Sequence, residues 1–442
     1  MDDSSFRAPM SRRAVLGGGV AAAAAMALAA CSSGGGASSK SGAPIKFWNM
    51  QWGGQPFTDA AKSITSSYKP AAGLGGVNYQ SVPWTNWYQT FMSAAASKTT
   101  PAVSDGAAFL PYLFLEQGIG APADDLVDLL NKRGENDFLP GVLEGMKTKN
   151  GYAAVPWAMD LRVLWYRKSI LEKAGAEVPT DWDSFIAAGT ALKKIGAVGL
   201  GMAASAAATD AHVVFALMFN NGGGFFAEDG TPDCVTDRNI ETLDFMNELV
   251  RKGIIDPRAA SYTPDNLAAD WQSGHVAMGW DQVSMNSRLT GDAATDAVVA
   301  SPIAGPHGDK ATAYWVNPIW MFKTTPSQKS SEEFTAYYLS QIHKYWEMGL
   351  VGDLPVKKSI IDLPIVQNNA NLVKSVKEWQ PIGKTIAAKA SVPFGGLVAV
   401  DGGSATTTFV GQIVQGTTPS NKMLKDLQAG LEKELAKAKA KG

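Results

Sequence analysis

Cysteine, net charge and long apolar segments are all scarce in this chain of 442 residues. It has two cysteines, Cys31 and Cys234, so a disulfide framework cannot hold the fold together and stability has to come from a buried core. The 39 basic and 41 acidic residues nearly cancel, which leaves a formal net charge of −2. A surface so close to neutral gives no electrostatic reason to expect a nucleic acid as a partner.

Motifs of enzyme and metal chemistry are missing as well. The sequence contains no GxSxG nucleophile motif and no HExxH zinc motif, and its 4 histidines are widely scattered. Gly383-Lys384-Thr385 is similar to the end of a phosphate-binding loop, but Glu378 stands where that motif needs glycine, so we interpret it as a chance match at a helix start. We therefore predict no metal, no cofactor and no catalytic residue.

A short apolar segment does occur near the N-terminus. Arg12 and Arg13 precede an alanine-rich run from residue 14 to residue 30 that contains three glycines and is shorter than the ~20 residues of a membrane span. A charged start, a short apolar middle and small residues before a cut are the three parts of an export signal. Ser11-Arg12-Arg13 resembles the twin-arginine type, so residues 1–30 are predicted to be an export signal.

The segment Leu28-Ala29-Ala30-Cys31 resembles a lipobox, the site at which exported proteins are cleaved and acylated. This resemblance implies that Cys31 becomes a lipid-bearing first residue, held on the outer face of the cell membrane by acyl chains at ~0.8 kcal/mol per methylene. Residues 31–43 are rich in Gly and Ser and are predicted to be a tether. Cys234 is then left without a disulfide partner, and we expect it to be a buried apolar group.

The rest of the chain is longer than one hydrophobic core usually allows, which favours two lobes. It alternates predicted strands and helices, a rhythm typical of an α/β sheet. We expect strands at residues 45–48, 77–82, 102–105, 157–167 and 314–322. We expect helices capped at Thr58, Thr85 and Thr180, helices ending at Gly253 and Gly349, and a terminal helix after Ser420.

Thirteen tryptophans are the most distinctive feature of the composition. Several stand beside a carboxylate or an amide, as in the pairs Trp157 with Asp160, Trp280 with Asp281 and Trp315 with Asn317. Aromatic rings cover the C–H faces of a pyranose, and carboxylates, amides and guanidinium groups bond its hydroxyls, so this pattern suits a sugar. We expect Trp165, Trp182, Trp346 and Trp379 to be core residues. For Trp157, Trp280 and Trp315, a position in the binding pocket and a position in the core are about equally expected.

Several blocks of the chain, in the same order, resemble the extracellular sugar-binding proteins of ABC importers, the broad family that includes maltose-binding protein. The most specific block is residues 151–167, with Pro156-Trp157-Ala158 and then Asp160, Arg162 and Tyr166-Arg167. The resemblance covers essentially the whole mature chain. It implies a type II periplasmic-binding-protein fold, in which two α/β lobes are joined by crossing hinge strands and hold the ligand in the cleft between them.

The same resemblance implies where the lobes and the site lie. Residues 44–159 with 315–361 would form one lobe, residues 160–314 with 362–442 the other, and Met159–Arg162 and Tyr314–Asn317 two of the crossings. Asp160 matches a position at which related binders place an acidic residue on the sugar. The predicted ligand-binding residues are Trp48, Gln51, Asp105, Trp157, Asp160, Arg162, Trp280, Asp281, Trp315 and Asn317.

The function implied is that of a monomeric, lipid-anchored receptor outside the cytoplasm, which captures a mono- or oligosaccharide and delivers it to an ABC transporter permease. The alternative that the residues leave open is an exported glycoside hydrolase or lyase, because paired carboxylates in an aromatic cleft can also cleave a sugar.

Overall fold

The structure is a computed structural model that describes residues 42–205, 211–390, 392–401 and 403–440. The predicted export signal, the predicted lipidation site Cys31 and nearly all of the predicted tether lie outside the described residues. Within them, no helix is both long enough and apolar enough to cross a membrane.

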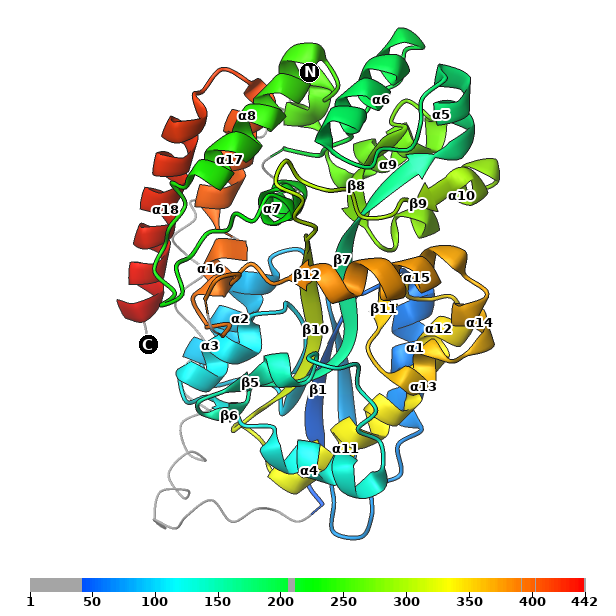
Figure 1. The fold of residues 1–442 in the computed structure, drawn as a ribbon. Coiled ribbons are helices and arrows are strands. Elements are labelled where there is room, and N and C mark those ends of the chain that lie inside the picture. The colour runs from blue at the N-terminus through cyan, green and yellow to red at the C-terminus, as the bar shows by residue number, and fades with distance from the viewer. Residues whose placement is uncertain (1–41, 206–210, 391, 402, 441–442) are drawn as a thin grey trace, which may run out of the picture. The chain divides into compact units, whose positions relative to one another are not determined.

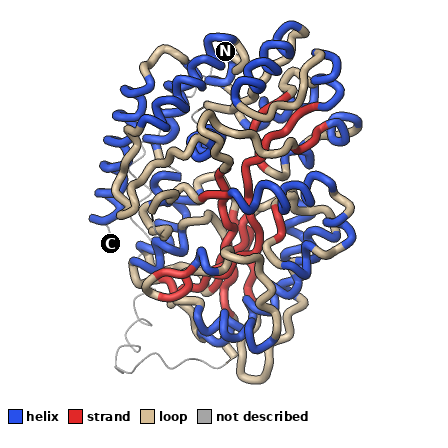
Figure 2. The backbone as a smooth tube through the Cα atoms, viewed as in Figure 1, coloured by secondary structure: helices blue, strands red, loops and turns tan. Residues whose placement is uncertain are grey.

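A mixed sheet runs through the centre of the fold, flanked by helices (Figure 2). Its main path has the order β11-β7-β10-β3-β1-β2. These strands are β1 (Ile45–Met50), β2 (Val77–Val82), β3 (Val103–Asp105), β7 (Val155–Arg167), β10 (Thr312–Phe322) and β11 (Leu354–Pro355). β1 is parallel to β2 and β3, whereas β10 is antiparallel to β3 and to β7. The predicted strand at residues 77–82 is therefore confirmed. Four further strands were predicted within one or two residues of their observed ends, at residues 45–48, 102–105, 157–167 and 314–322.

β7 and β10 each continue beyond this sheet and join it to a second group of strands (Figure 1). β7 pairs with β10 from Val155 to Leu161 and then changes partner at Arg162, where it meets β8 (Met278–Gln282). Further along, it also pairs with β9 (Ala297–Val299). The start of β10 pairs in parallel with β12 (Gly383–Lys384). These two long strands are the crossing strands of a two-lobed α/β fold.

We name the two parts by a strand of each. The β1 lobe holds β1–β3, β4 (Gly120–Ala121) and the helices around them (Figure 1). These helices are α1 (Gln55–Ser66), α2 (Trp87–Ala96), α3 (Leu110–Glu116), α4 (Asp124–Arg133), α11 (Gln328–Gln341), α12 (His343–Glu347), α13 (Lys358–Ile361) and α14 (Pro364–Gln367). The short strands β5 (Lys147–Thr148) and β6 (Gly151–Tyr152) form a separate hairpin.

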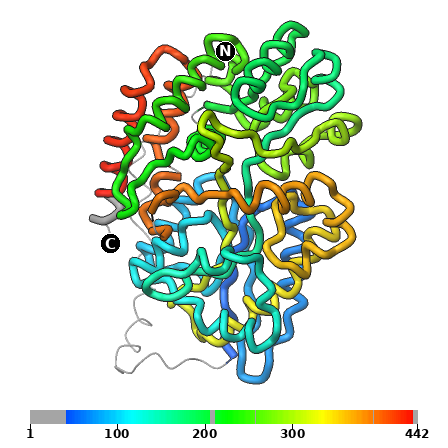
Figure 3. Tube along the Cα trace, viewed as in Figure 1, coloured from blue at the N-terminus to red at the C-terminus, as the bar shows by residue number. Residues whose placement is uncertain are grey.

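The β8 lobe holds β8 and β9 with a second set of helices. They are α5 (Lys168–Ala174), α6 (Trp182–Lys194), α7 (Ala211–Asn220), α8 (Asp237–Lys252), α9 (Pro264–Ser273), α10 (Asp292–Asp296), α17 (Ser404–Gln415) and α18 (Ser420–Ala440). After α14 the chain returns to this lobe, where α15 (Ala370–Lys374) packs on β9, before α16 (Leu397–Asp401) packs on α18. Figure 3 shows this return as the orange segment.

Three of the predicted helix boundaries are wrong. α1 begins at Gln55, before Thr58, because Pro56 occupies its first turn, where proline's missing N–H costs no hydrogen bond. α2 is preceded by Asn86 in a left-handed conformation, so Thr85 is not its cap. α6 is capped by Asp181, whose carboxylate accepts from the Ser184 N–H at 2.8 Å, one residue after the expected Thr180. Gly253 does end α8, as predicted, but the helix expected to end at Gly349 is divided at Ile342 into α11 and α12.

The sequence suggested that Gly383-Lys384-Thr385 begins a helix. This prediction is wrong, because Gly383 and Lys384 form the strand β12.

The four tryptophans expected in the core are buried, at 0% to 5% exposure. Each indole N–H has an acceptor: Gln282 O for Trp165, Asn220 Oδ1 for Trp182, Asp353 O for Trp346 and Ala300 O for Trp379. A buried indole needs such a partner, which is what fixes the orientation of these rings. Cys234 is free and fully buried, as expected.

The crossing itself can be tested at Thr312. Its hydroxyl donates to the carbonyl oxygen of Arg162 at 2.5 Å, at the residue where β7 changes partner, and Thr312 is fully buried. Thr312→Val keeps the shape but removes the donor, so it should lower the free energy of unfolding by ~1–3 kcal/mol in urea titrations. Thr312→Ser keeps the donor and should lose less. Equal stability of the valine variant and the native chain would contradict a structural role for this bond.

Candidate functional site

One face of the crossing strands carries a group of polar and aromatic side chains. Asp160 of β7 lies opposite Trp315 of β10, and Ala158 lies opposite Asn317. Because alternate residues of a strand share a face, Asp160 and Arg162 lie on the same face as Trp315 and Asn317. Four of the predicted site residues are thus brought together by strand pairing alone.

Arg162 and Asp160 form a close ion pair at this crossing. Nη1 of Arg162 donates to both carboxylate oxygens of Asp160 at 2.8 Å, and the side chains are 5% and 15% exposed. Nη2 of Arg162 is 2.6 Å from Nδ1 of His212, the second residue of α7. On the other side of the imidazole, Nε2 lies 3.2 Å from Oδ1 of Asp401, at the end of α16.

His212 is held as a neutral imidazole. Burial and the neighbouring charge of Arg162 lower the pKa of His212, against the opposing effect of Asp401. Since a guanidinium can only donate, Nδ1 has to accept from Arg162, and the Nε2 proton is then donated to Asp401. The imidazole of His212 therefore links Arg162 of β7 to Asp401 of α16 by hydrogen bonds and adds no second positive charge.

Trp315 is stacked within this network. Its ring lies 3.8 Å from the His212 ring at an interplanar angle of 26°, and the Arg162 guanidinium lies 5.0 Å from its centroid. Its indole N–H donates to Oδ1 of Asp401 at 3.0 Å. A stack between an imidazole and a guanidinium holds the ring in one orientation.

A second carboxylate, Asp353, lies close to Asp160. Nδ2 of Asn317 donates to Oδ2 of Asp353 at 2.7 Å. Burial, followed by the charge of Asp160, raises the pKa of Asp353, whereas the bond from Asn317 and the charge of Arg162 oppose the rise. The group thus holds three carboxylates around one guanidinium, which makes it rich in hydrogen-bond acceptors.

A row of tryptophan rings leads from the β1 lobe to this group. Trp157 packs edge-on against Trp52 at 5.2 Å, Trp52 against Trp84 at 4.8 Å, and Trp84 against Trp87 at 6.4 Å. Trp157 is buried, the next three rings are half-buried, and Tyr88 beyond them is exposed. We call Trp52, Trp84, Trp87 and Trp157 the tryptophan row.

Asp105 fixes the inner end of the tryptophan row. It accepts from the N–H of Met50 at 2.6 Å, from Nδ2 of Asn49 at 2.5 Å and from Nε1 of Trp52 at 3.0 Å. Burial raises the pKa of Asp105 to about 7, against the lowering effect of these three bonds. The row is also joined to the polar group, because Trp157 packs on Trp346, whose indole N–H donates to Asp353 O at 2.9 Å.

The candidate site thus includes Asp105, Trp157, Asp160, Arg162, Trp315 and Asn317 from the sequence prediction. For the other four predicted residues, Trp48, Gln51, Trp280 and Asp281, the described part of the chain shows no side-chain contact with this group. Trp48 packs edge-on against Phe91 of α2 at 5.5 Å, and Gln51 is an exposed residue just after β1. Trp280 is 2% exposed and packs on Phe185 in the core of the β8 lobe, and Asp281 is paired with Arg288 at 2.5 Å.

Sequence reasoning missed Trp52, Trp84, Trp87, His212, Asp353 and Asp401. Trp84 and Trp87 offered a signal, since these two tryptophans stand three residues apart at a helix start, with the polar Thr85 and Asn86 between them. The other three polar residues come from α7, α16 and the segment before β11, and no local pattern marks them.

A cavity of about 440 Å³ lies against the opposite side of β10, and none of the predicted residues lines it. Tyr314 and Val316, which alternate with Trp315 and Asn317, form part of its wall. We place the sugar-type chemistry at the polar group, because it combines carboxylates with stacked aromatic rings, whereas the lining of the cavity includes no acidic residue.

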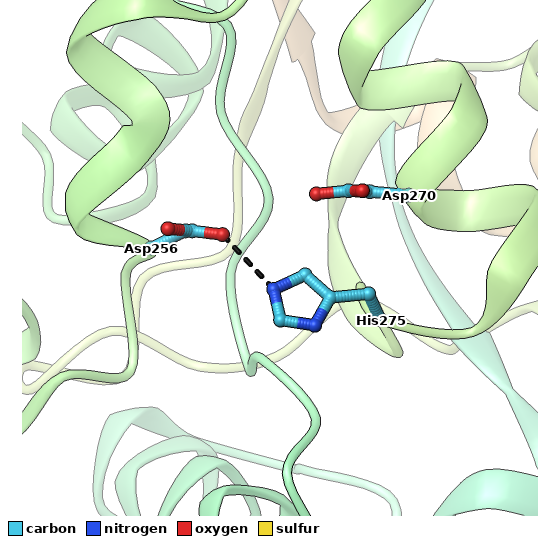
Figure 4. A group of neighbouring side chains, drawn as sticks. All are labelled: Asp256, Asp270 and His275. Carbon is cyan, nitrogen blue, oxygen red and sulfur yellow. Dashed lines mark hydrogen bonds and ion pairs between the residues drawn. The ribbon is translucent and has the colours of Figure 1, made fainter.

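Asp256, Asp270 and His275 lie close enough together to hold a metal ion (Figure 4). Their ligand atoms are already engaged, however. Nε2 of His275 is 3.0 Å from Asp256, the Arg258 guanidinium donates to Asp256 at 2.7 Å, and the Tyr262 hydroxyl donates to Asp270 at 2.6 Å. A cation would have to displace these bonds and approach the guanidinium, so we assign the group a structural role.

The fold and the site together define a class, the two-lobed α/β solute-binding proteins. A maltose-bound protein of T. maritima superposes with a TM-score of 0.73 over 88% of this chain and 99% of its own, at 17% identity. At that identity the likeness concerns the fold alone.

The chain belongs to the family described as bacterial extracellular solute-binding protein, whose model matches residues 76–342. A sugar transporter from Arthrobacter chlorophenolicus A6, solved with bound laminaribiose, is 46% identical, with a TM-score of 0.83 over 89% of this chain and 99% of that one. A binding protein of Brucella abortus (strain 2308) is 26% identical over 327 residues, which are 72% of this chain and 76% of the relative.

These findings confirm the predicted family and the two-lobed fold. The chain is a sugar-binding protein of the ABC transporter type, it acts outside the cytoplasm, and it is a binding protein rather than an enzyme. The alternative of a glycoside hydrolase or lyase is set aside on this ground.

The Asp256 group allows a test by pH. Burial raises the pKa of Asp256, but the bonds from Arg258 and His275 outweigh burial and lower it to about 2. A carboxylate whose folded pKa is depressed stabilises the fold above its ordinary value near ~3.9, and that contribution is lost as the pH falls to the folded value. Asp256→Asn should therefore lower the free energy of unfolding by ~1–2 kcal/mol at pH 7, a figure reduced for the exposed guanidinium.

The difference between this variant and the native chain should shrink as the pH falls from ~4 to ~2. Asp309→Asn is the control, since Asp309 is a half-exposed carboxylate paired with Arg238 at 3.4 Å. A difference that stays constant over this pH range in thermal melts would refute the assignment.

Proposed function

We propose that this protein is a lipid-anchored receptor on the outer face of the cell membrane that captures a short β-linked glucan of the laminaribiose type and delivers it to an ABC transporter permease. The observation that carries the ligand class is the 46% identity to the laminaribiose-bound sugar transporter, which spans 89% of this chain. The polar group and the tryptophan row would be the binding site.

The chemistry of the site suits a neutral sugar. The half-buried rings of Trp52, Trp84 and Trp87 can cover the C–H faces of successive pyranose rings. Asp160, Asp353 and Asp401 offer carboxylate oxygens to ring hydroxyls, and hydrogen bonds to a charged acceptor are the stronger kind. With acceptors in excess over donors, a ligand that brings many hydroxyl donors is favoured over one that brings its own negative charge.

The position of the site couples binding to lobe closure. Trp52 and Asp105 belong to the β1 lobe, and His212 belongs to the β8 lobe. We propose the predicted lobe boundaries, residues 44–159 with 315–361 and residues 160–314 with 362–442, with one change. α14 stays with the β1 lobe, because it packs on α12 and α13. A ligand that contacts both sides favours the closed arrangement by its difference in affinity for the two states.

Asp160 is the residue with which to test the ligand site. Asp160→Asn should weaken laminaribiose binding roughly 10- to 150-fold in calorimetry, because a charged hydrogen bond contributes ~1.5–3 kcal/mol. Asp281→Asn is the matched control, since Asp281 is also a buried carboxylate paired with an arginine, but within the β8 lobe. Unchanged affinity in Asp160→Asn, together with a lowered melting temperature of the ligand-free protein, would show that Asp160 only holds Arg162 in place.

Cys31 is the residue with which to test the anchor. If Leu28 to Cys31 is a lipobox, Cys31→Ser should leave an uncleaved precursor or a protein released from the membrane fraction. Cell fractionation and the mass of the mature N-terminus measure this. Processing and membrane retention equal to those of the native chain would remove the lipid from the proposal and leave the sugar-binding function intact.

A further inference from the structure

The cavity on the opposite side of β10 is not explained by sugar binding. It has a volume of about 440 Å³, within the range of small-molecule sites. The β1 lobe contributes Phe109 and Tyr112, the β8 lobe contributes Phe219, and β10 contributes Tyr314 and Val316. It therefore lies between parts of both lobes and behind the strand that carries Trp315.

The walls of this cavity are largely apolar. Phe109, Tyr112 and Phe219 are almost fully buried, and Ala108, Met146 and Ala387 add further apolar surface. The Tyr112 hydroxyl is already used, since it donates to the carbonyl oxygen of Gly145 at 2.7 Å. Few polar groups are thus left to receive the many hydroxyls of a sugar, and the deeper part suits a ring without hydroxyl groups.

Two lysines give the cavity a cationic side. Lys384 and Lys389 line it and are exposed, and within the described part of the chain neither ammonium forms an ion pair or a hydrogen bond. Asp309, whose carboxylate approaches Gly222 of the lining, is itself paired with Arg238. The positive charges of Lys384 and Lys389 are thus not balanced by any acidic residue of the lining.

The backbone at Lys389 is unusual. Its φ of 80° is positive, in a region that side chains other than glycine rarely adopt. Such a conformation costs of order 1 kcal/mol or more and persists where the surroundings impose it, often at ligand sites. Glycine would fit this backbone conformation better. The presence of lysine is therefore a second indication, after the missing ion pair, that the charge of Lys389 has a role in binding.

We propose that this cavity is a second ligand site, which takes a small amphiphilic anion. An aromatic or alicyclic ring would lie among Phe109, Tyr112 and Phe219, and a carboxylate would lie at the open end beside Lys384 and Lys389. Burial of apolar surface holds the ring, and charge-assisted bonds to the lysines select the anion. The site is distinct from the sugar site in both location and charge preference.

A pair of probes with the same ring tests the charge preference. 2-Naphthoate and the neutral 2-naphthylmethanol should differ, with naphthoate binding the full chain at least ~10-fold more tightly in calorimetry. The double variant Lys384→Ala/Lys389→Gly should abolish this difference. Both substitutions change exposed side chains, and glycine suits the backbone at residue 389, so folding should be preserved.

The location is tested with one variant that fills the cavity and one that alters the sugar site. Ala390→Trp should abolish binding of both probes, whereas Asp160→Asn should leave naphthoate binding unchanged. A melting curve checks that each variant is folded, independently of the proposed sugar function. Laminaribiose affinity gives a second check for the variants that lie outside the sugar site. Three results would overturn the proposal: no binding of naphthoate, equal affinity for the two probes, or loss of naphthoate binding in Asp160→Asn.

Discussion

The antiparallel pairing of β7 with β10 is the contact on which both lobes and both candidate sites depend. Each strand is long enough to belong to one sheet at one end and to another group of strands at the other end. Both are buried along nearly their whole length, so their backbone groups need partners throughout. The change of partner at Arg162 meets that need with β8 and with the hydroxyl of Thr312. The lobes are therefore joined by regular hydrogen-bonded structure rather than by a loose linker.

The electrostatic character of the polar group follows from that burial. Arg162 is 4% exposed and is surrounded by Asp160 and the neutral ring of His212, with Asp353 and Asp401 further out. A buried charge is tolerated only when it is well paired, which makes this arrangement expensive to assemble and hard to rearrange. A preorganised set of acceptors loses little freedom when a ligand arrives. The cost of assembling these charges is thus incurred in folding, and binding a neutral polyol then needs little further ordering.

The sequence could predict the parts of the site that local patterns specify. Asp160 and Arg162 on one strand, with Trp315 and Asn317 on another, follow from strand periodicity and from the resemblance to a known family. Trp48 shows the limit of this prediction. Side chains alternate between the two faces of β1, and Trp48 lies on the face that packs against Phe91.

Trp52, four residues on in the following turn, bonds Asp105 instead. Trp280 directly precedes an aspartate, and Trp315 lies two residues before an asparagine, yet Trp280 packs in a core. His212 and Asp401 are 189 residues apart, and only the folded chain brings them into contact.

Adjacent residues of β10 give the two sides of the crossing opposite charge preferences. Trp315 and Asn317 face a group with three carboxylates. Tyr314 and Val316 face a cavity lined by two lysines that have no acidic partner among the described residues. Side chains of a strand alternate between its faces, so a single strand can serve two sites without either site altering the other's residues. Its backbone, however, is common to both. Any shift of β10 relative to the lobes changes the walls of both sites together, since each site also draws residues from both lobes.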